Sequence, residues 1–162
     1  MDPVVRLATP NDIADLARLQ ALARAGLEPV RGGALRLQEC AEVTDWASVL
    51  NDDSRLVVVG TLDDMVSSYM VMHLVPSKDR GIITHAFVEA EARELGLGDT
   101  MVEVAIATVR EAGLAGIEAV ALPGDRETKN LYERAGLTAR KLTVYKSLSA
   151  DTSRMTEATP PA

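Results

Sequence analysis

The residues from Val88 to Thr100 contain the pattern with the most definite chemistry in this sequence. A valine at the predicted end of a strand leads into Arg93-x-x-Gly96-x-Gly98, and a helical pattern follows. Glycines at the start of a helix let main-chain N–H groups approach an anion closely, and the helix N-terminus adds about half a positive charge. The segment therefore predicts a main-chain cradle for a pyrophosphate group.

Two other nucleotide-binding loops do not match the same residues. Met101 stands where the dinucleotide fingerprint requires its third glycine. No Gly-Lys-Ser/Thr follows, so the lysine and hydroxyl of a triphosphate-binding loop are missing. The pattern therefore indicates a pyrophosphate site of a different kind.

Length and composition limit the classes of protein to which this chain can belong. Its 162 residues fit a single domain. With 24 acidic and 17 basic residues the formal net charge is −7, and few aromatic residues are present, which argues against a nucleic-acid partner. Cys40 is the only cysteine, so no internal disulfide or cysteine cluster for a metal is expected, and no metal is predicted. Neither an apolar signal segment nor a membrane span of about 18 apolar residues is present. We expect a cytoplasmic protein without a membrane partner.

Hydrophobic periodicity and turn residues predict alternating strands and helices. Thr9, Pro10 and Asp12 form a capping-box pattern at the start of the first helix. Asp63-Asp64 separates two valine-rich runs and predicts a hairpin, and Asp125 is a predicted helix cap. The predicted strands are residues 4–8, 55–61, 65–75, 81–88, 116–122 and 137–148, and the predicted helices are 13–26, a weaker stretch around Trp46 and Leu50, 99–112 and 126–134. Residues 27–34 are expected to be irregular. One domain is expected over residues 1–148, and residues 149–162 are predicted to be a disordered tail.

This order of elements, together with two motifs, resembles the GNAT superfamily of acyl-CoA-dependent N-acyltransferases. The motifs are Val88 through Gly98 and Asn130-Leu-Tyr132-Glu-Arg-Ala-Gly136-Leu. The resemblance covers residues 4 to 148. It implies an α/β (α+β) fold of the GNAT acyl-CoA N-acyltransferase type, with a mixed central sheet that is splayed between its fourth and fifth strands and flanked by helices.

The resemblance also implies a cosubstrate and a reaction. Acetyl-CoA would donate its acetyl group to a primary amine that attacks the thioester directly, without a metal. Asp125 stands where relatives often place an asparagine that bonds the pantetheine arm. Phe87 and Val88 are expected to meet that arm, and the pyrophosphate is expected to be surrounded by Arg93, Glu94, Leu95, Gly96, Leu97, Gly98, Asp99 and Thr100. Glu94 and Asp99 add negative charge to this loop.

Two groups are expected to assist the reaction if the resemblance holds. Tyr132 occupies the family's general-acid position, and a phenol with a pKa of about 10 stays protonated at neutral pH until it donates to the leaving sulfur. A main-chain N–H near Val88 would stabilise the oxyanion. A tyrosine that only lies at a helix interface remains the alternative for Tyr132.

The general base is left open by the sequence. Relatives with a side-chain base carry it four or six residues before the strand-end valine, which here gives Thr84 and Ile82, and neither can act as a base. His85 is one residue out of that alternation and is expected on the other face of the sheet unless a bulge shifts the register. His73 on the preceding strand and a water chain are the other candidates. An acceptor amine of low pKa would need no strong base.

The acceptor is the least specified part of the prediction. In the family it is selected by the connection between the first two helices, here about residues 26–37, and by the loops around the splayed strands. In and just after this connection, Arg31, Glu28 and Glu39 are candidates to fix a charged group. The predicted partner is a small-molecule or peptide amine, and a homodimer formed through edge or terminal strands is compatible with the resemblance. A non-catalytic CoA-binding regulatory module and a transferase of a larger acyl group are the alternative functions.

Overall fold

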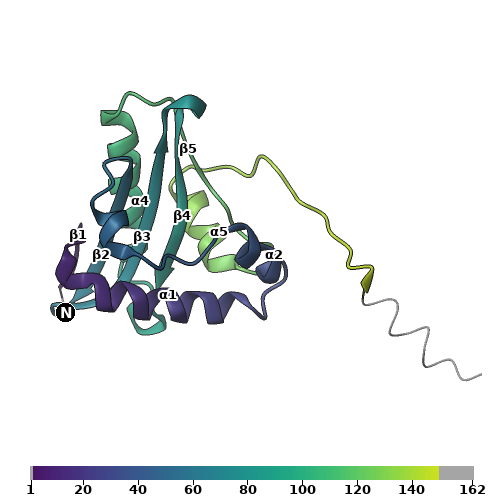
Figure 1. The fold of residues 1–162 in the computed structure, drawn as a ribbon, viewed down its shortest axis with the longest axis horizontal. Coiled ribbons are helices and arrows are strands. Elements are labelled where there is room, and N and C mark those ends of the chain that lie inside the picture. The colour runs from purple at the N-terminus through teal and green to yellow at the C-terminus, as the bar shows by residue number, and fades with distance from the viewer. Residues whose placement is uncertain (1, 150–162) are drawn as a thin grey trace, which may run out of the picture.

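Five strands form one mixed sheet in the computed structural model, which describes residues 2–149. Their order in the sheet follows their order in the chain (Figure 1). The neighbouring pairs are antiparallel from β1 to β4, and β4 and β5 are parallel. The strands are β1 (Pro3–Leu7), β2 (Arg55–Leu62), β3 (Met65–Val75), β4 (Arg80–Val88) and β5 (Gly116–Ala119). This sheet and its flanking helices confirm the predicted fold class.

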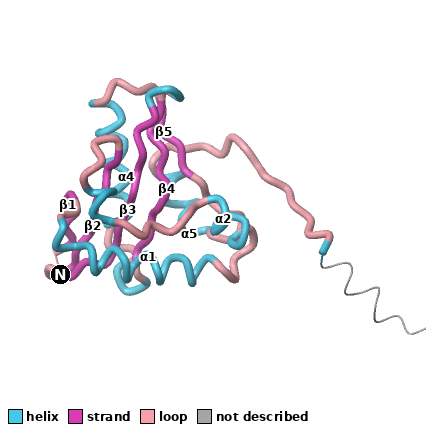
Figure 2. The backbone as a smooth tube through the Cα atoms, viewed as in Figure 1, coloured by secondary structure: helices cyan, strands magenta, loops and turns pink. Residues whose placement is uncertain are grey.

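Within residues 2–149, five α-helices connect or flank these strands; Figure 2 colours the helical segments cyan. They are α1 (Ile13–Leu27), α2 (Gly33–Glu39), α3 (Trp46–Leu50), α4 (Leu97–Glu111) and α5 (Arg126–Arg134). The connection between α1 and β2 contains α2 in addition to the predicted helical stretch around Trp46. Within residues 2–149, no helix combines the length and the apolar character needed to cross a lipid bilayer.

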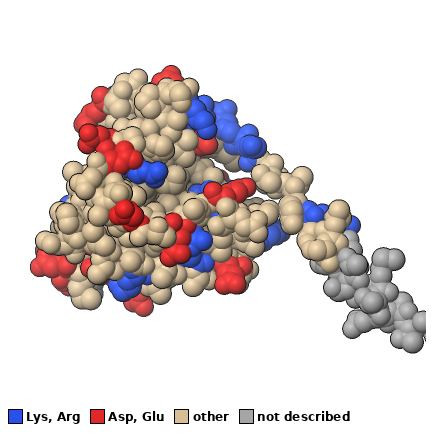
Figure 3. Space-filling view, in the orientation of Figure 1, with Lys and Arg blue, Asp and Glu red and all other residues tan. Residues whose placement is uncertain are grey.

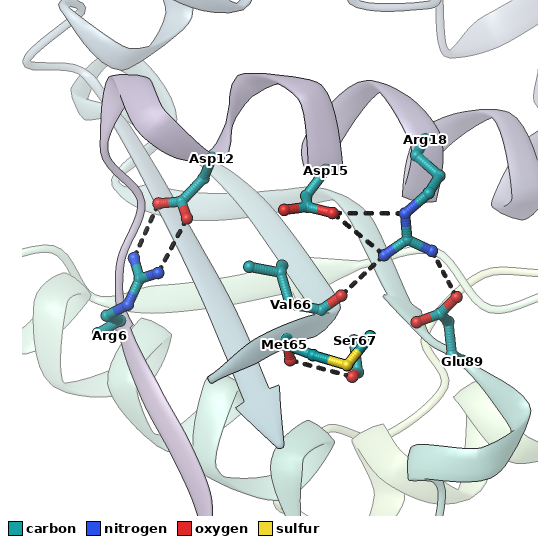
Figure 4. A network of polar contacts seen from close by, with 8 residues as sticks. All are labelled: Arg6, Asp12, Asp15, Arg18, Met65, Val66, Ser67 and Glu89. Carbon is teal, nitrogen blue, oxygen red and sulfur yellow. Dashed lines mark hydrogen bonds and ion pairs between the residues drawn. The ribbon is translucent and has the colours of Figure 1, made fainter. Parts of the chain in front are cut away.

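The start of α1 is stabilised by the predicted capping residues. A short 3-10 turn (Pro10–Asp12) precedes the helix, and the Asp12 carboxylate accepts a hydrogen bond from the Thr9 N–H at 2.7 Å. The same carboxylate accepts two further bonds from the Arg6 guanidinium, at 2.8 and 2.9 Å (Figure 4). The entry of the chain into α1 is therefore tied to β1.

The hairpin of β2 and β3 forms around the predicted Asp63-Asp64 turn. Both residues have positive φ, 47° and 67°. A two-residue loop with positive φ at both positions matches the right-handed twist of the strands that it joins, and aspartate tolerates this conformation better than most residues. Successive side chains of β2 and β3 point to opposite faces of the sheet, so the hairpin contributes side chains to both faces.

Each face of the sheet packs on its own set of helices. On one face, Met70, Met72 and Ile83 pack with α4 and α5. On the other face, Val57, Val59, Tyr69 and Val71 pack with α1 and α3. The α4 side chains in the first cluster are Met101, Val102, Ala105 and Val109, and the second cluster includes Leu16, Leu19 and Trp46. The sheet therefore separates an α4–α5 side from an α1–α2–α3 side.

Arg18 fixes α1 to the sheet beside the end of β4. Its guanidinium donates to the Val66 carbonyl at 2.8 Å and to the Glu89 carboxylate at 2.6 Å (Figure 4). Asp15, one turn earlier in α1, accepts from the same guanidinium. This contact holds α1 next to the segment that leads into the predicted cradle.

The prediction of a last strand over residues 137–148 is wrong for the structure. Residues 138–147 have no regular secondary structure and lead away from the sheet (Figure 1). Among them and just after them, Leu142, Val144, Tyr145 and Leu148 are exposed. A strand requires a partner for its main-chain polar groups, and the described part of the chain pairs nothing with the outer edge of β5. The predicted disordered tail, residues 149–162, lies outside the described residues from residue 150 onward.

Candidate functional site

The sheet opens between β4 and β5. The two strands pair only where Arg80–Ile83 faces Gly116–Ala119, and β4 continues to Val88 without β5. On the opposite edge, the Glu89 N–H donates to the Ser67 carbonyl at 2.9 Å. Successive N–H groups of a strand point to opposite edges, so the Val88 N–H points toward the opening. This geometry exposes the main chain at the end of β4 to a ligand.

A β-bulge at Thr84 changes which side chains of β4 share a face. Ile83 lies opposite Met72 and His85 lies opposite Val71, which leaves Thr84 without a partner in β3. Uninterrupted alternation from Val88 would put Thr84 on the α4–α5 side, but Ile83 occupies that side instead. His85 remains on the α1 side, as the alternation predicted. Its ring lies near Tyr69, with ring centroids 6.4 Å apart.

A pocket lies at this opening and is lined from both sides of the sheet. It brings together His85, Tyr132 and Asp125, whereas His73 is not among its lining residues. The lining residues are Ala23, Arg24 and Leu27 of α1, Arg36, Leu37 and Cys40 in and after α2, Tyr69, Ile83, Thr84, His85 and Ala86 of the sheet, and Val120, Leu122, Asp125, Thr128 and Tyr132 near α5. The separation of β4 from β5 therefore lets groups from opposite faces reach one cavity.

Tyr132 presents a protonated phenol to this pocket. The residue belongs to α5, is 6% exposed and packs in the core cluster formed by α4, α5 and one face of the sheet. No residue in the described range forms a hydrogen bond with its hydroxyl. Burial raises the pKa of Tyr132 well above its ordinary value, Arg36 opposes this shift and Asp125 adds to it. The hydroxyl is therefore available as a proton donor at neutral pH.

His85 presents a neutral imidazole to the same pocket. The Thr84 hydroxyl donates to the Val71 carbonyl at 3.3 Å, and its oxygen lies 2.9 Å from His85 Nδ1. The other ring nitrogen, Nε2, faces the Sγ atom of Cys40. Burial lowers the pKa of His85 to about 4; the positive charge of Arg36 adds to this shift and the main chain of Ala41 opposes it. The ring can therefore accept a proton at neutral pH, although it is a weak base.

The predicted main-chain cradle corresponds to the N-terminus of α4. Gly96 precedes the helix with φ 82°, and the Thr100 N–H donates to the Gly96 carbonyl at 3.0 Å. Within the described residues, the N–H groups of Leu97, Gly98 and Asp99 have no main-chain acceptor. A Cβ atom added to Gly96 would have no heavy atom within 4 Å, so the space beside it is open. These groups fit a phosphate anion.

The side chains of the cradle are largely engaged elsewhere. Leu97 is buried in the core, and a Cβ on Gly98 would lie 3.2 Å from Leu131, so both residues offer only their main chain to a ligand. The Asp99 carboxylate binds Arg134 through two bonds of 2.9 and 3.1 Å. Arg134 therefore offsets the negative charge that the sequence places beside the cradle.

The two remaining charged residues of the cradle differ in their contacts. Arg93 donates to the Val88 carbonyl at 3.2 Å and pairs with Glu127 at 2.8 Å. Glu94 is exposed and adopts a left-handed conformation with φ 67°. Arg93 thus links the cradle to both the end of β4 and the start of α5.

Asp125 caps α5, as predicted. Its carboxylate accepts a hydrogen bond from the Thr128 N–H at 3.1 Å and from the Thr128 hydroxyl at 2.7 Å. These bonds satisfy a main-chain donor at the helix start. The cap also positions Asp125 in the pocket lining, on the same side as Tyr132.

Arg24, Arg36 and Cys40 line the pocket, although the sequence pattern predicted no role for them. The residues predicted to contact the acceptor, Arg31, Glu28 and Glu39, are exposed and do not line the pocket. A signal for Arg24 existed, because it follows the buried residues Leu16 and Gln20 at helical spacing. Arg36 offered no comparable signal, since α2 begins inside the segment predicted to be irregular. Over residues 2–149 no group of three or more His, Cys, Asp or Glu side chains is arranged to hold a metal ion.

The mixed sheet that opens between β4 and β5 is the fold of this domain, and comparison with known families identifies the family to which it belongs. A family model described as the acetyltransferase (GNAT) family matches residues 19–137. Since this match spans well over half of the 162 residues, the chain belongs to the GNAT acetyltransferase family. A search of curated proteins gave no match.

Solved structures share the fold at low sequence identity. A tetramutant of the BH1408 protein from Bacillus halodurans has a TM-score of 0.71 at 20% identity, covering 90% of this chain and 99% of its own. An aminoglycoside acetyltransferase from an uncultured soil metagenomic sample has a TM-score of 0.68 at 16% identity, covering 90% and 94%. A ribosomal-protein-alanine N-acetyltransferase from Brucella melitensis biovar Abortus 2308 has a TM-score of 0.64 at 15% identity, covering 91% and 100%. The similarity extends over almost the whole of each fold.

Proposed function

We propose that this chain transfers the acetyl group of acetyl-CoA to a primary amine by direct attack on the thioester. The observation that carries the proposal is the pocket at the opening between β4 and β5. There the unpartnered Tyr132 phenol, the neutral His85 imidazole and the open edge of β4 meet within reach of one ligand. Membership of an acetyltransferase family supports the reaction class.

The cradle binds the pyrophosphate of acetyl-CoA in this proposal. The N–H groups of Leu97, Gly98 and Asp99 supply the donors, and the α4 dipole adds a favourable field. Phe87 and Val88 contact the pantetheine arm as it enters the opening of the sheet. Asp125 borders the arm on the α5 side, and its capping bonds with Thr128 fix the direction of its carboxylate.

The transfer needs a donor for the oxyanion and a donor for the leaving sulfur. The amine nitrogen forms a bond to the thioester carbon, and the carbonyl oxygen gains negative charge that the Val88 N–H stabilises. The carbon–sulfur bond then breaks, and Tyr132 gives its proton to the departing thiolate. The raised pKa of the phenol keeps that proton in place until the sulfur leaves.

His85 is the base in this proposal, because it is the histidine that lines the pocket. Its Nε2 accepts a proton from the attacking amine, whose N–H groups become much more acidic once the new carbon–nitrogen bond forms. A pKa of about 4 makes His85 inefficient for deprotonating a free alkylammonium ion, whose pKa is about 10. The reaction therefore starts from the fraction of acceptor that is already neutral.

The first test is calorimetric titration of the purified chain with acetyl-CoA and with CoA. Thiol release from acetyl-CoA is then measured in the presence of pooled primary amines, and an active pool is separated into its members. Binding with amine-dependent release supports the enzyme. Binding without release for every pool favours a non-catalytic CoA-binding module, and release from longer acyl-CoA donors alone favours a transferase of a larger acyl group. Absence of binding by a folded sample contradicts the placement of the cradle.

A further inference from the structure

Two arginines in the pocket lack the carboxylate partners that other arginines of this protein have. Arg24 and Arg36 are both partly buried and line the pocket, and neither forms an ion pair with any described residue. Figure 3 shows acidic and basic side chains interspersed over the face in view. The arginines that do pair with carboxylates are Arg6, Arg18, Arg55, Arg80, Arg93 and Arg134. The pocket therefore carries two guanidinium groups that form no ion pair with any described residue.

The hydrogen bonds of these two guanidinium groups orient them without neutralising them. Arg24 donates to the carbonyls of Cys40 at 2.9 Å and Leu37 at 3.5 Å, at the end of α2. Arg36 donates to the Thr84 carbonyl at 2.9 Å, at the bulge of β4. A guanidinium has five N–H donors in a planar fork, so several donors of each side chain remain for a ligand. Carbonyl acceptors hold the fork in place while its charge stays available.

The positive charge acts on the groups that are proposed to react. Arg36 lowers the pKa of both His85 and Tyr132, although burial is the largest cause of each overall shift. Asp125 is the only acidic residue among those that line the pocket. Its carboxylate lies on the α5 side, where it accepts both hydrogen bonds from Thr128. The α1–α2 side of the pocket is therefore suited to an anion.

We infer that Arg24 and Arg36 bind a carboxylate of the acceptor, so that the amine substrate is an amino acid or a similarly small amine with a carboxylate a few bonds from its nitrogen. The inference rests on the proposed function and names the substrate class of the same site. Arginine is the side chain best suited to a planar carboxylate, because its fork matches the two oxygens. Amines with several positive charges, such as aminoglycosides, meet two uncompensated guanidinium groups and are disfavoured.

The acceptor is a better source of this carboxylate than the acyl donor. The cradle and Tyr132 belong to α4 and α5, whereas Arg24 and Arg36 belong to α1 and α2 on the other side of the sheet. A ligand whose pyrophosphate lies at α4 enters from the α4–α5 side and presents its thioester at the opening. The attacking amine then comes from the α1–α2 side, where the arginines lie.

The test compares amino acids with their amides as acceptors, using alanine with alaninamide and β-alanine with β-alaninamide. Release of CoA thiol is followed at pH 8 with saturating acetyl-CoA. The amine of the amide has the lower pKa, so at pH 8 a larger fraction of it is neutral and able to attack the thioester. Without a carboxylate site, the amide should therefore react faster than the acid. We expect kcat/KM nevertheless to favour the acid by about tenfold or more, because only the acid pairs with the guanidinium groups.

Three variants connect such a preference to the arginines. Arg36→Gln and Arg24→Gln keep a donor for the main-chain carbonyls but remove the charge, and each is expected to reduce the acid-to-amide ratio to about one while amide acetylation continues. Arg36→Lys keeps the charge without the fork and is expected to retain part of the ratio. Arg110→Gln removes an equal charge from an exposed position in the last turn of α4 and is the matched control.

A binding measurement distinguishes failure of this inference from failure of the proposed function. N-acetylalanine and its amide are titrated calorimetrically into the chain in the presence of CoA, and we expect only the acid to bind in a manner that Arg36→Gln abolishes. If the acid binds in this way but no amine is ever acetylated, the carboxylate site stands and the proposed reaction fails. Equal use and equal binding of acid and amide, or a ratio unchanged in both glutamine variants, overturns the inference. An arginine-dependent preference for succinyl-CoA over acetyl-CoA, without an acceptor preference, also overturns it by assigning the arginines to the acyl donor.

Discussion

The Nε2 atom of His85 lies 3.5 Å from the Sγ atom of Cys40. Cys40 is the single cysteine of the chain, so a thiol reagent can modify this position alone. Carbamidomethylation by iodoacetamide adds an amide group where the imidazole faces the pocket. We expect the treated protein to lose about 90% or more of its amine acetylation, because the added group occupies space that the acceptor needs. A tenfold loss of rate corresponds to a barrier increase of about 1.4 kcal/mol. CoA affinity, measured by calorimetry, is expected to change little.

Cys40→Ala is the control for this experiment. The variant removes the thiol without adding volume, so it is expected to keep activity within a fewfold of the parent and to resist iodoacetamide. Full activity of a quantitatively alkylated parent protein would contradict the location of the acceptor pocket. Mass spectrometry measures the extent of alkylation.

The partly buried imidazole of His85 makes the free energy of unfolding depend on pH. Its pKa is about 4 in the folded protein and about 6.5 in an unfolded chain. Between these values the unfolded state binds more protons, so the stability contributed by the neutral ring is present above pH 6.5 and is lost as the pH falls to 4. Urea unfolding at pH 7, 5.5 and 4.5 should show this decline. His85→Gln should show a smaller decline over the same interval, and identical slopes would place the imidazole in solvent.

Removal of the Tyr132 hydroxyl separates catalysis from folding. Because the hydroxyl has no hydrogen-bond partner among the described residues, Tyr132→Phe should change the free energy of unfolding by less than about 0.5 kcal/mol. Loss of a general acid should lower kcat by about a hundredfold or more, with CoA affinity retained. Tyr145→Phe, at an exposed position, is the control. A Tyr132→Phe variant with unchanged kcat would remove the phenol from the mechanism.

A negative charge introduced at Thr100 gives a sharper test of the cradle than a substitution of Gly98 does. A side chain on Gly98 would press on Leu131 and disturb the packing of α4 on α5. Thr100 is exposed in the first turn of α4, where a carboxylate is compatible with the helix dipole. Thr100→Glu should weaken CoA binding by about tenfold, or ~1.4 kcal/mol, through repulsion of the pyrophosphate.

Thr100→Gln is the matched variant, since it has the same size without the charge. It should weaken CoA binding much less than Thr100→Glu, and added salt should narrow the difference between the two. Equal affinities of the two variants at low ionic strength would indicate that the phosphates lie elsewhere. Calorimetric titration at two salt concentrations provides the measurement.

The parts of the structure that sequence could predict depend on neighbouring residues. The caps at Thr9–Asp12 and Asp125 and the start of α4 at Gly96 are formed by groups within a few residues of one another. The two-residue Asp63-Asp64 turn is local in the same sense. Because the groups in these contacts are close together in the sequence, the types and spacing of the residues were sufficient to predict them.

The parts that sequence missed depend on contacts between distant segments. The bulge at Thr84 exists only in the pairing of β4 with β3, and simple alternation therefore assigned the wrong β4 residues to the face of Val88. Arg36 reaches the site because its guanidinium donates to Thr84, 48 residues away. The low pKa of His85 has the same origin, since burial and the charge of Arg36 arise only when these segments meet.

The segment after α5 provides the final test, because its strand-like sequence and its structure disagree. Residues 138–147 contain β-branched and apolar residues but no regular secondary structure, and Val144 is 86% exposed. Their amide hydrogens should exchange with solvent near the rate of an unstructured peptide, whereas amides of β3, which is paired on both sides, should be protected by several orders of magnitude. Hydrogen–deuterium exchange followed by mass spectrometry compares the two segments in one sample. Protection of residues 138–147 at all protein concentrations would mean that the predicted strand forms within the chain. Protection only at high concentration would mean that it pairs with a second copy, and either result would contradict the absence of regular secondary structure in residues 138–147.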